Sequence, residues 1–138
     1  MEKRINARGI IIEDNSVYLM FRRRIKEDGS IKEYYVIPGG GKNEEETVEE
    51  NVIREIREEF SVDVRVTGYI GMDETEDAIT HFFACEIVKG IPKLGGEELE
   101  RFTESNYYEI RKILINELDH IDVSYKDIIL KVYNHEYV

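Results

Sequence analysis

The chain is 138 residues long, and 41% of these residues are hydrophobic, with nine Tyr and five Phe. This apolar content excludes a generally disordered chain and predicts a single compact domain over residues 1–138. Thirty acidic and nineteen basic residues give a formal net charge of −11, which disfavours a nucleic-acid partner because such binding depends on Lys and Arg neutralising phosphates. An anionic small substrate fits this charge only if a cation, such as a carboxylate-bound divalent metal, lies between it and the protein.

Neither the cysteine content nor the N-terminal sequence indicates export. Cys85 is the single cysteine, so it cannot form a disulfide within the chain, and its apolar surroundings in HFFACEIV predict a buried thiol. The stretch MEKRINARGIII contains charges and only a three-residue apolar run, which is too short for the core of a signal peptide. No segment approaches the length of a membrane-spanning helix. We therefore expect a soluble cytoplasmic protein with no membrane partner.

The first part of the chain predicts three strands followed by a glycine-rich connection. Two runs of β-forming residues between positions 5 and 24 flank the turn-rich EDNS, which predicts a hairpin. A third strand, IKEYYVI over 31–37, ends abruptly at Pro38 and three glycines. Gly39 and Gly40 predict a loop in which the backbone can approach a ligand or a helix closely, because glycine has no Cβ.

An amphipathic helix is predicted after this loop, over residues 44–60, because apolar side chains recur at helical spacing: Val48, Val52, Ile53, Ile56 and Phe60. The remaining elements, predicted from the same patterns, are strands over 62–72 and 78–88, a long charged loop over 89–106, a strand over 107–115, a turn at 116–119 and a helix over 124–134 capped by Ser124. One central and one terminal helix among these strands predict an α/β fold with a mixed β-sheet and helices packed on its faces.

Three glutamates of the central helix, Glu55, Glu58 and Glu59, stand at i, i+3 and i+4 and therefore share one face. Like charges at this spacing destabilise a helix by roughly 0.2–0.5 kcal/mol per pair, and the later two also oppose the helix dipole. Divalent ions such as Mg²⁺ prefer oxygen ligands, commonly one or two carboxylates plus waters and substrate phosphates. The helix alone indicates either a metal site or a solvated acidic face, partly neutralised by Arg54 and Arg57.

Loop and helix together resemble the Nudix box, the signature of the Nudix (MutT-like) hydrolases, G-x5-E-x7-R-E-U-x-E-E-x-G-U, in which U is a bulky aliphatic residue. The match runs through Gly40, Glu46, Arg54, Glu55, Ile56, Glu58, Glu59 and Val62. Every charged position of the box is matched at the expected spacing, and only the last glycine differs, being Ser61 here. A glycine at that point commonly ends the helix in a left-handed conformation, which serine adopts at a cost of roughly 1 kcal/mol.

The resemblance implies a Nudix-type α/β/α sandwich and a Mg²⁺- or Mn²⁺-dependent hydrolase of nucleotide pyrophosphates. By similarity to the family, Glu58 and Glu59 hold the divalent metal. Glu55 is implied to be either a further ligand or the base that activates water. A homodimer is also an expectation from the family.

The same resemblance implies roles for other residues near and beyond the helix. Arg54 matches the arginine that orients the carboxylates, and Glu46 matches the first glutamate of the box and is a further candidate metal ligand. Gly39 and Gly40 correspond to the family's loop before the helix. Many members add a carboxylate from a later loop, for which the candidates here are Glu98, as first choice, Glu100 and Glu104.

Some residues outside the box are compatible with substrate contact. Arg22 to Arg24 lie at the end of a predicted strand, where they could meet substrate phosphates or form a solvated strand end. Four tyrosines, at positions 34, 35, 107 and 108, could stack a base, although tyrosines in strands are more often core residues. His81 follows a strand pattern beside Phe82, which predicts a structural role.

We therefore predict a metal-dependent hydrolase of nucleoside diphosphates linked to another moiety, in which water attacks phosphorus. Two alternatives stay open: a Nudix-fold module that binds nucleotides without turnover, and an acidic protein-interaction domain without a ligand. The intact Glu55, Glu58 and Glu59 disfavour the first alternative. Since specificity in this family lies in loops outside the box, ADP-ribose, an oxidised nucleoside triphosphate, a dinucleoside polyphosphate and a nucleotide sugar all remain candidate substrates.

Overall fold

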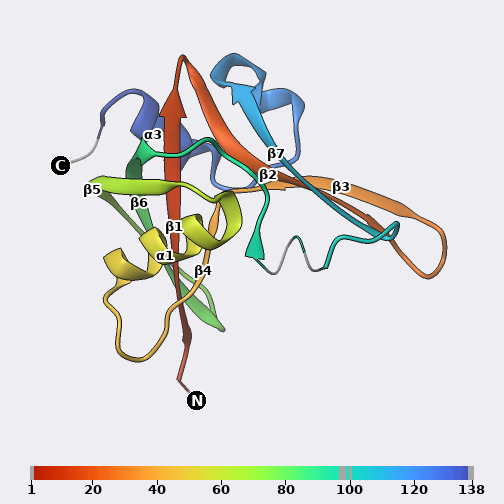
Figure 1. Cartoon of the computed structure of the whole chain (residues 1–138), viewed down its shortest axis with the longest axis horizontal. Helices are drawn as coiled ribbons and strands as arrows, with labels where there is room; N and C mark the ends of the chain where they lie inside the picture. Colours follow the sequence, from red (N-terminus) through yellow and green to blue (C-terminus); the bar gives the residue numbers. More distant parts are fainter. Residues whose placement is uncertain (1, 97–98, 100, 137–138) are drawn as a thin grey trace.

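The computed structural model describes residues 2–96, 99 and 101–136 (Figure 1). The described residues form a seven-stranded mixed sheet in the order β3-β2-β1-β6-β5, with β4 paired to β1 and β7 paired to β2. The strands are β1 (Arg4–Glu13), β2 (Ser16–Ile25), β3 (Ile31–Val36), β4 (Gly39–Gly41), β5 (Asp63–Glu74), β6 (Ala78–Lys89) and β7 (Asn106–Leu114). The described helices are α1 (Val48–Phe60), α3 (Lys126–Tyr133) and the 3-10 helix η1 (Ile115–His120). The predicted α/β fold with a mixed sheet is confirmed.

The hairpin at the start of the chain opens into a V (Figure 1). Asp14 and Asn15 have φ angles of 53° and 61°, as in the tight two-residue turns that suit twisted strands. β1 and β2 pair beside this turn, where Ile12 lies opposite Val17. β2 then leaves β1, and the glycine strand β4 pairs with β1 further along. The predicted hairpin is confirmed, and its divergence makes room for β4.

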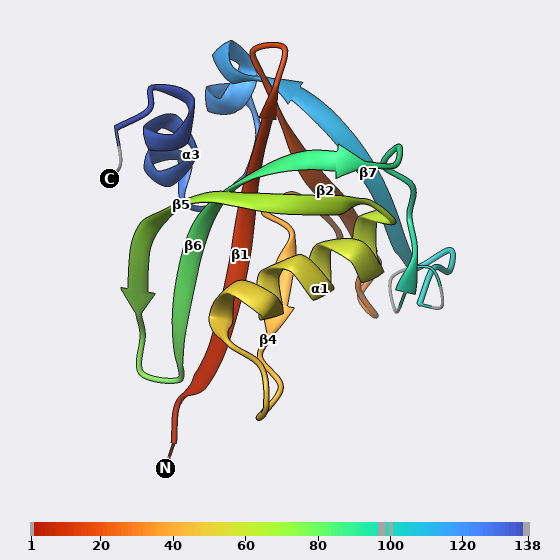
Figure 2. The ribbon, with the colours of Figure 1, turned by 60° about the vertical axis from the view of Figure 1, so that its left-hand side comes forward.

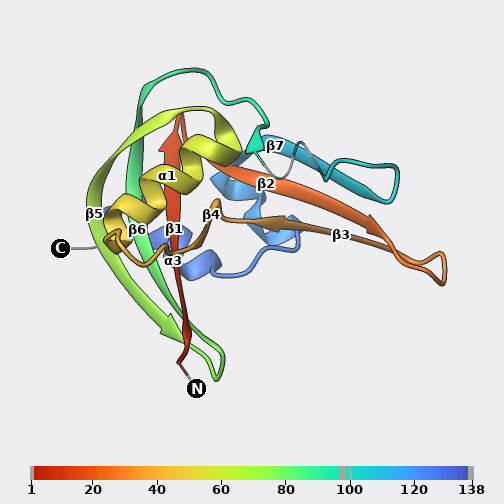
Figure 3. The same ribbon diagram turned by 60° about the horizontal axis from the view of Figure 1, so that its bottom comes forward.

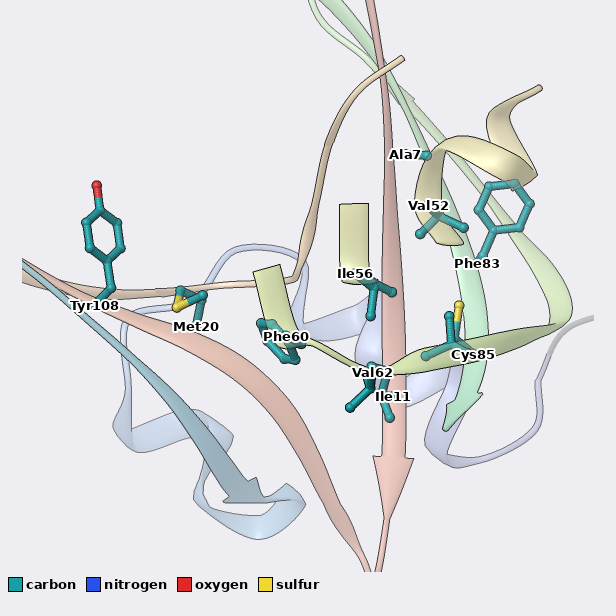
Figure 4. Packing of buried hydrophobic residues seen from close by; sticks show 11 residues of the cluster. Ala7, Ile11, Met20, Val52, Ile56, Phe60, Val62, Phe83, Cys85 and Tyr108 are labelled. Atoms are coloured by element: carbon teal, nitrogen blue, oxygen red, sulfur yellow. The ribbon is translucent and has the colours of Figure 1, made fainter. Parts of the chain in front are cut away.

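Alternate residues of β1 contribute to two cores on opposite faces of the sheet. In the core beneath α1, β1 supplies Ala7 and Ile11 (Figure 4), whereas in the core beneath α3 it supplies Ile10. The helix residues in these cores are Val52, Ile56 and Phe60 of α1, and Ile129 and Val132 of α3. α1 and α3 therefore cover opposite faces of the sheet, which confirms the predicted α/β/α layers (Figure 2).

β2 continues beyond the V as the middle strand of a three-stranded extension with β3 and β7 (Figure 3). Both neighbours run antiparallel to it, so side chains at paired positions share a face. The segment that precedes α3 returns to this extension, where the Tyr35 N–H donates to the Asp122 carbonyl over 2.8 Å. This bond holds the segment before α3 beside β3.

The central helix begins later than predicted. Its N-cap is Thr47, whose hydroxyl accepts from the Glu50 N–H (3.1 Å), while the Glu50 carboxylate accepts from the Thr47 N–H (2.9 Å). This capping box fixes the first turn at Val48, so the prediction that residues 44–46 belong to the helix is wrong. At the other end, Ser61 has φ 59° and ψ 30°, which confirms the expected left-handed cap at the position where the box has glycine.

Three smaller predictions also need correction. Residues 39–40 form part of a strand instead of a loop, because their backbones pair with β1. The turn expected at 116–119 lies within the 3-10 helix η1. Ser124 is not the N-cap of the last helix, since that position belongs to Tyr125, with φ 66° and no side-chain capping bond. The Tyr125 hydroxyl instead donates to Asp73 over 2.8 Å.

The other strand predictions agree with β5, β6 and β7 to within a few residues. Cys85 of β6 is buried beneath α1, and burial raises the pKa of its thiol to about 12, so the predicted buried thiol is confirmed. The His81 ring lies against Tyr69, whose hydroxyl is 2.8 Å from His81 Nδ1. Within the described ranges, no helix has the length and apolar character needed to cross a bilayer.

Candidate active site

The residues of the Nudix box meet around the short strand β4, which pairs with β1 and contacts α1. Asn51, fully buried on α1, donates its Nδ2 to the carbonyls of Gly40 (3.3 Å) and Gly41 (3.2 Å). These bonds hold the helix against the glycine strand one turn before Glu55. Asn51 was not among the predicted site residues, although a polar residue on the apolar stripe of an amphipathic helix is the signal that could have found it.

The glycines of β4 permit two close approaches. A Cβ at Gly40 would lie 2.8 Å from Glu55 Cδ and 2.9 Å from each carboxylate oxygen. At Gly39 the φ angle is 147°, and a Cβ there would meet the backbone of Ala7 and of Arg8. The predicted close approach to a helix is therefore present at Gly40, whereas Gly39 approaches β1 instead. Contact of Gly39 or Gly40 with a ligand stays a prediction.

Arg54 joins the acidic residues of the box into one network. Its Nη2 donates to Glu46 (2.7 Å) and to the Gly41 carbonyl (2.9 Å). Its Nη1 donates to Glu55 and to Glu58, each over 3.2 Å. The bond from Arg54 holds the pKa of Glu46 below its usual range, and the carboxylates raise the pKa of Arg54. This is the arrangement expected of an arginine that orients carboxylates.

A cavity of about 210 Å³ lies beside this network. Glu55 and Glu59 of α1 line it, and Glu59 is only 8% exposed. The basic residues that line it are Arg4, Arg8, Arg22 and Arg101. In a chain with a net charge of −11, this cavity gathers four cations next to two carboxylates.

The predicted metal ligands do not all lie in this cavity. Glu55 and Glu59 face it, whereas Glu58 has a 52% exposed side chain and bonds to Arg54, as does Glu46. Among residues 2–96, 99 and 101–136, no three His, Cys, Asp or Glu side chains stand close enough to enclose an ion. The donors nevertheless fit a hard divalent cation, because they are carboxylate oxygens and Gly40 leaves space for the Glu55 carboxylate at the cavity. Glu98 lies outside the described residues.

Arg8 of β1 is a site residue that the sequence analysis did not identify. Its Nη1 donates to the Ile37 carbonyl over 2.6 Å, and its side chain lines the cavity of Glu55 and Glu59. Burial lowers the pKa of Arg8, and the negative charge of Glu59 opposes that shift. The available signal was an arginine inside the strand sequence INARGIII, where a solvated charge is not expected.

Of the three consecutive arginines, Arg22 lines the cavity. Its guanidinium carbon is 4.9 Å from the centre of the Tyr108 ring and 5.5 Å from that of Tyr34, and its Nη2 donates to the Tyr108 hydroxyl over 3.1 Å. Within the described part of the chain, the buried Arg22 Nε has no hydrogen-bond partner. Arg23 lies over Tyr107 on the other face of β2. The structure therefore brings one of the predicted arginines to the site.

A second cavity, of about 340 Å³, lies between β3 and the segment that precedes α3. Tyr34 and Tyr35 line it on one side, and Asp122 and Tyr125 line it on the other. Arg8 lines this cavity as well as the first. Of the four tyrosines proposed to stack a base, two therefore lie at a cavity with aromatic and polar walls, while Tyr107 and Tyr108 do not line it.

Comparison with known proteins places this geometry in context. The model of the NUDIX domain family matches residues 3–126. An ADP-ribose pyrophosphatase of Methanocaldococcus jannaschii is 34% identical over 89 residues, which are 64% of this chain and 50% of that protein. This chain thus spans about half the length of that relative.

Solved structures of low sequence identity share the fold. An ADP-ribose pyrophosphatase of Streptococcus suis has a TM-score of 0.67 at 14% identity, with 99% of this chain and 94% of that chain covered. A MutT NUDIX hydrolase of Burkholderia pseudomallei has a TM-score of 0.71 at 19% identity, with 95% and 98% covered. Since the family model also covers most of the sequence, from β1 to the start of α3, the predicted family is confirmed: this chain belongs to the NUDIX family.

Proposed function

We propose that this protein is a Mg²⁺- or Mn²⁺-dependent hydrolase that cleaves the pyrophosphate of a nucleoside diphosphate linked to a second group. The observation that carries the proposal is the cavity of about 210 Å³ in which Glu55 and Glu59 face four arginines. Carboxylates attract a divalent cation, and arginines bind phosphate oxygens through paired N–H groups. The cavity thus combines the two kinds of group that recognise a metal-bound pyrophosphate.

The acidic residues have distinct roles in this proposal. Glu58 and Glu59 hold the divalent ion, with Glu55 beside them, and Glu58 exchanges its bond to Arg54 for this role. The ion, when bound, lowers the pKa of a water molecule and neutralises charge on the diphosphate. Glu55, kept in place by Gly40 and Arg54, accepts the proton of the attacking water. The new bond joins the water oxygen to phosphorus, the bridging P–O bond breaks, and two phosphate-terminated products leave.

The nucleoside part of the substrate is assigned to the cavity of about 340 Å³, whose walls include Tyr34, Tyr35 and Tyr125. Aromatic side chains offer faces for a base, and the neighbouring Asp122 and Ser124 offer polar groups for the ribose or the base. The relative from Methanocaldococcus jannaschii is described as an ADP-ribose pyrophosphatase, which makes ADP-ribose the first substrate to test. Nucleotide sugars, dinucleoside polyphosphates and oxidised nucleoside triphosphates complete the panel.

The experiment is hydrolysis of this panel by purified protein with Mg²⁺ or Mn²⁺, followed by phosphate analysis of the products. At least one substrate should be cleaved, EDTA should stop the reaction, and Glu58→Gln or Glu59→Gln should abolish it. Glu49→Gln is the matched control, because Glu49 is exposed on the same helix outside the Arg54 network. Activity that survives both substitutions or EDTA would refute the mechanism. Nucleotide binding without turnover under either metal would favour a sensing module instead.

The proposal includes two further expectations, one about the cellular location of the protein and one about its oligomeric state. A cytoplasmic location agrees with the single reduced cysteine, Cys85, which is buried. A homodimer is expected by similarity to the family, and light scattering of the purified protein at several concentrations tests it. The acidic surface supports a small-molecule substrate in preference to nucleic acid.

A further inference from the structure

Arg8 lies between the two cavities of the site. Arg8 and Val36 line both the cavity of about 210 Å³, with Glu55 and Glu59, and the cavity of about 340 Å³, with the tyrosines. Of these two shared residues, only Arg8 carries a charge. A molecule that occupies both cavities at once must therefore pass a guanidinium at the junction.

The position of this guanidinium is fixed by its surroundings. Gly39 lies opposite Arg8 in the β1–β4 pairing, and a Cβ at Gly39 would lie only 2.8 Å from Arg8 Cγ. At its far end, the side chain donates Nη1 to the Ile37 carbonyl over 2.6 Å. No other hydrogen bond of the Arg8 side chain is made with any described residue, so most of the five N–H donors of the guanidinium remain for a ligand.

The electrostatic setting of Arg8 also favours an anion. Removing a guanidinium from water is unfavourable unless it meets an opposite charge. Among the groups around Arg8, Glu59 has the largest favourable effect, Tyr125 and Glu55 have smaller ones, and Arg4 acts in the opposite direction. These two carboxylates are also the proposed neighbours of a divalent ion, which would share their negative charge. Without that ion, the four arginines that line the cavity of about 210 Å³ still outnumber its two carboxylates, so a phosphate at the junction meets a net positive charge.

We infer that Arg8 binds the phosphate that joins the nucleoside to the rest of the substrate, so that a nucleoside 5′-monophosphate is the unit recognised across the two cavities. The inference rests on the proposed function for the choice of a nucleotide ligand. It adds two properties to that function. The site binds a nucleoside monophosphate without a divalent metal, and this product of hydrolysis competes with the substrate.

The experiment measures binding, and it does not depend on turnover. Isothermal titration calorimetry in EDTA compares AMP, GMP, CMP and UMP with the corresponding nucleosides. In the wild type, at least one monophosphate should bind about 10-fold more tightly than its nucleoside, since a charge-assisted hydrogen bond contributes about that factor. Arg8→Gln should weaken binding of the monophosphate more than binding of the nucleoside and so remove most of this ratio, and Arg8→Lys should retain part of it.

Controls separate a loss of the phosphate contact from a loss of fold. Arg65→Gln removes an exposed arginine that pairs with Glu86 on the β5–β6 hairpin, and it should bind like the wild type. Circular dichroism checks the fold of each variant, and Arg8→Lys decides the question if Arg8→Gln does not fold. A ratio that is the same in the wild type and in a folded Arg8 variant would overturn the inference, as would failure of every monophosphate to bind the wild type in EDTA.

The two proposals fail in different ways. Hydrolysis of a pyrophosphate substrate by the wild type, together with a monophosphate ratio that does not depend on Arg8, would leave the proposed function intact and refute the role of Arg8. Binding of a monophosphate that depends on Arg8, without hydrolysis under either metal, would refute the enzyme and support the binding site. With both results positive, the released monophosphate should inhibit competitively, and less so in Arg8→Gln.

Discussion

Replacing Gly40 by alanine tests whether the place of the Glu55 carboxylate controls the reaction. The added Cβ would lie 2.8 Å from Glu55 Cδ, roughly 1 Å inside the separation of ~3.5–4.0 Å at which carbon atoms rest. Gly40 does not have a positive φ angle, so alanine suits the backbone. The atoms that must move are therefore those at the flexible end of Glu55.

The expected effects on stability and on rate differ in size. Replacing glycine by alanine at a compatible position stabilises a protein by about 0.4–1 kcal/mol through the unfolded chain. Moving Glu55 weakens its bond to Arg54, which is 3.2 Å long in the wild type. This loss offsets the gain in stability from alanine by up to ~1 kcal/mol. The free energy of unfolding should thus change by less than about 1 kcal/mol. A misplacement of ~1 Å in a catalytic group can lower kcat about 100-fold.

Urea denaturation and steady-state hydrolysis of the preferred substrate measure the two effects. Gly41→Ala is the matched control in the same strand, because the nearest atom to a Cβ there is Arg4 Nη2 at 3.3 Å, at the end of a flexible side chain. This control should keep most of the wild-type rate. The reasoning would be refuted if Gly40→Ala folded and hydrolysed substrate like the wild type, or if both alanine variants lost activity equally.

Three further predictions concern single residues. Ser61→Gly should raise the free energy of unfolding by about 1 kcal/mol, because Ser61 adopts a left-handed conformation (φ 59°); calorimetry that shows a lower melting temperature would contradict this. The bond from Arg54 lowers the pKa of Glu46. The loss of folding stability caused by Glu46→Gln should therefore be constant at neutral pH and become smaller below about pH 4. Equal losses at pH 3 and pH 7 in denaturant titrations would argue against that linkage. Burial raises the pKa of Cys85 to about 12, so a thiol reagent at pH 8 should label the unfolded protein and spare the native one, and rapid native labelling would disprove this.

The fold was predictable to the extent that local patterns determine it. The apolar stripe and the Nudix box identified α1, but its first turn was placed too early because glutamates near residue 44 also suit a helix N-terminus. Thr47 and Glu50 form a capping box that the sequence T-x-x-E already contains. The strand character of β4 was not predictable in this way, because three glycines have no β propensity and pair only because β2 leaves β1.

The candidate site was likewise predictable where it depends on local sequence, and it was not predictable where it depends on tertiary structure. The network of Arg54 with Glu46, Glu55 and Glu58 lies within one short stretch of chain, and the resemblance to the Nudix box was enough to anticipate it. The arginines of the cavity come from β1, β2 and the loop before β7, and their meeting depends on tertiary structure. Arg8 in particular could be located only once β4 was placed beside β1.

The alternation of β1 between two cores has a consequence for cooperativity and for tolerance to insertions. Because Ile10 and Ile11 belong to different cores, β1 cannot leave the sheet without exposing apolar residues of both cores, and the amides of this strand should exchange with deuterium only through global unfolding. Inserting one residue into β1 would exchange its two faces. The α1 core would then receive a side chain at the place of Gly9, where a Cβ would lie 2.6 Å from Ile56. Both the fold and the site therefore require the register that β1 has.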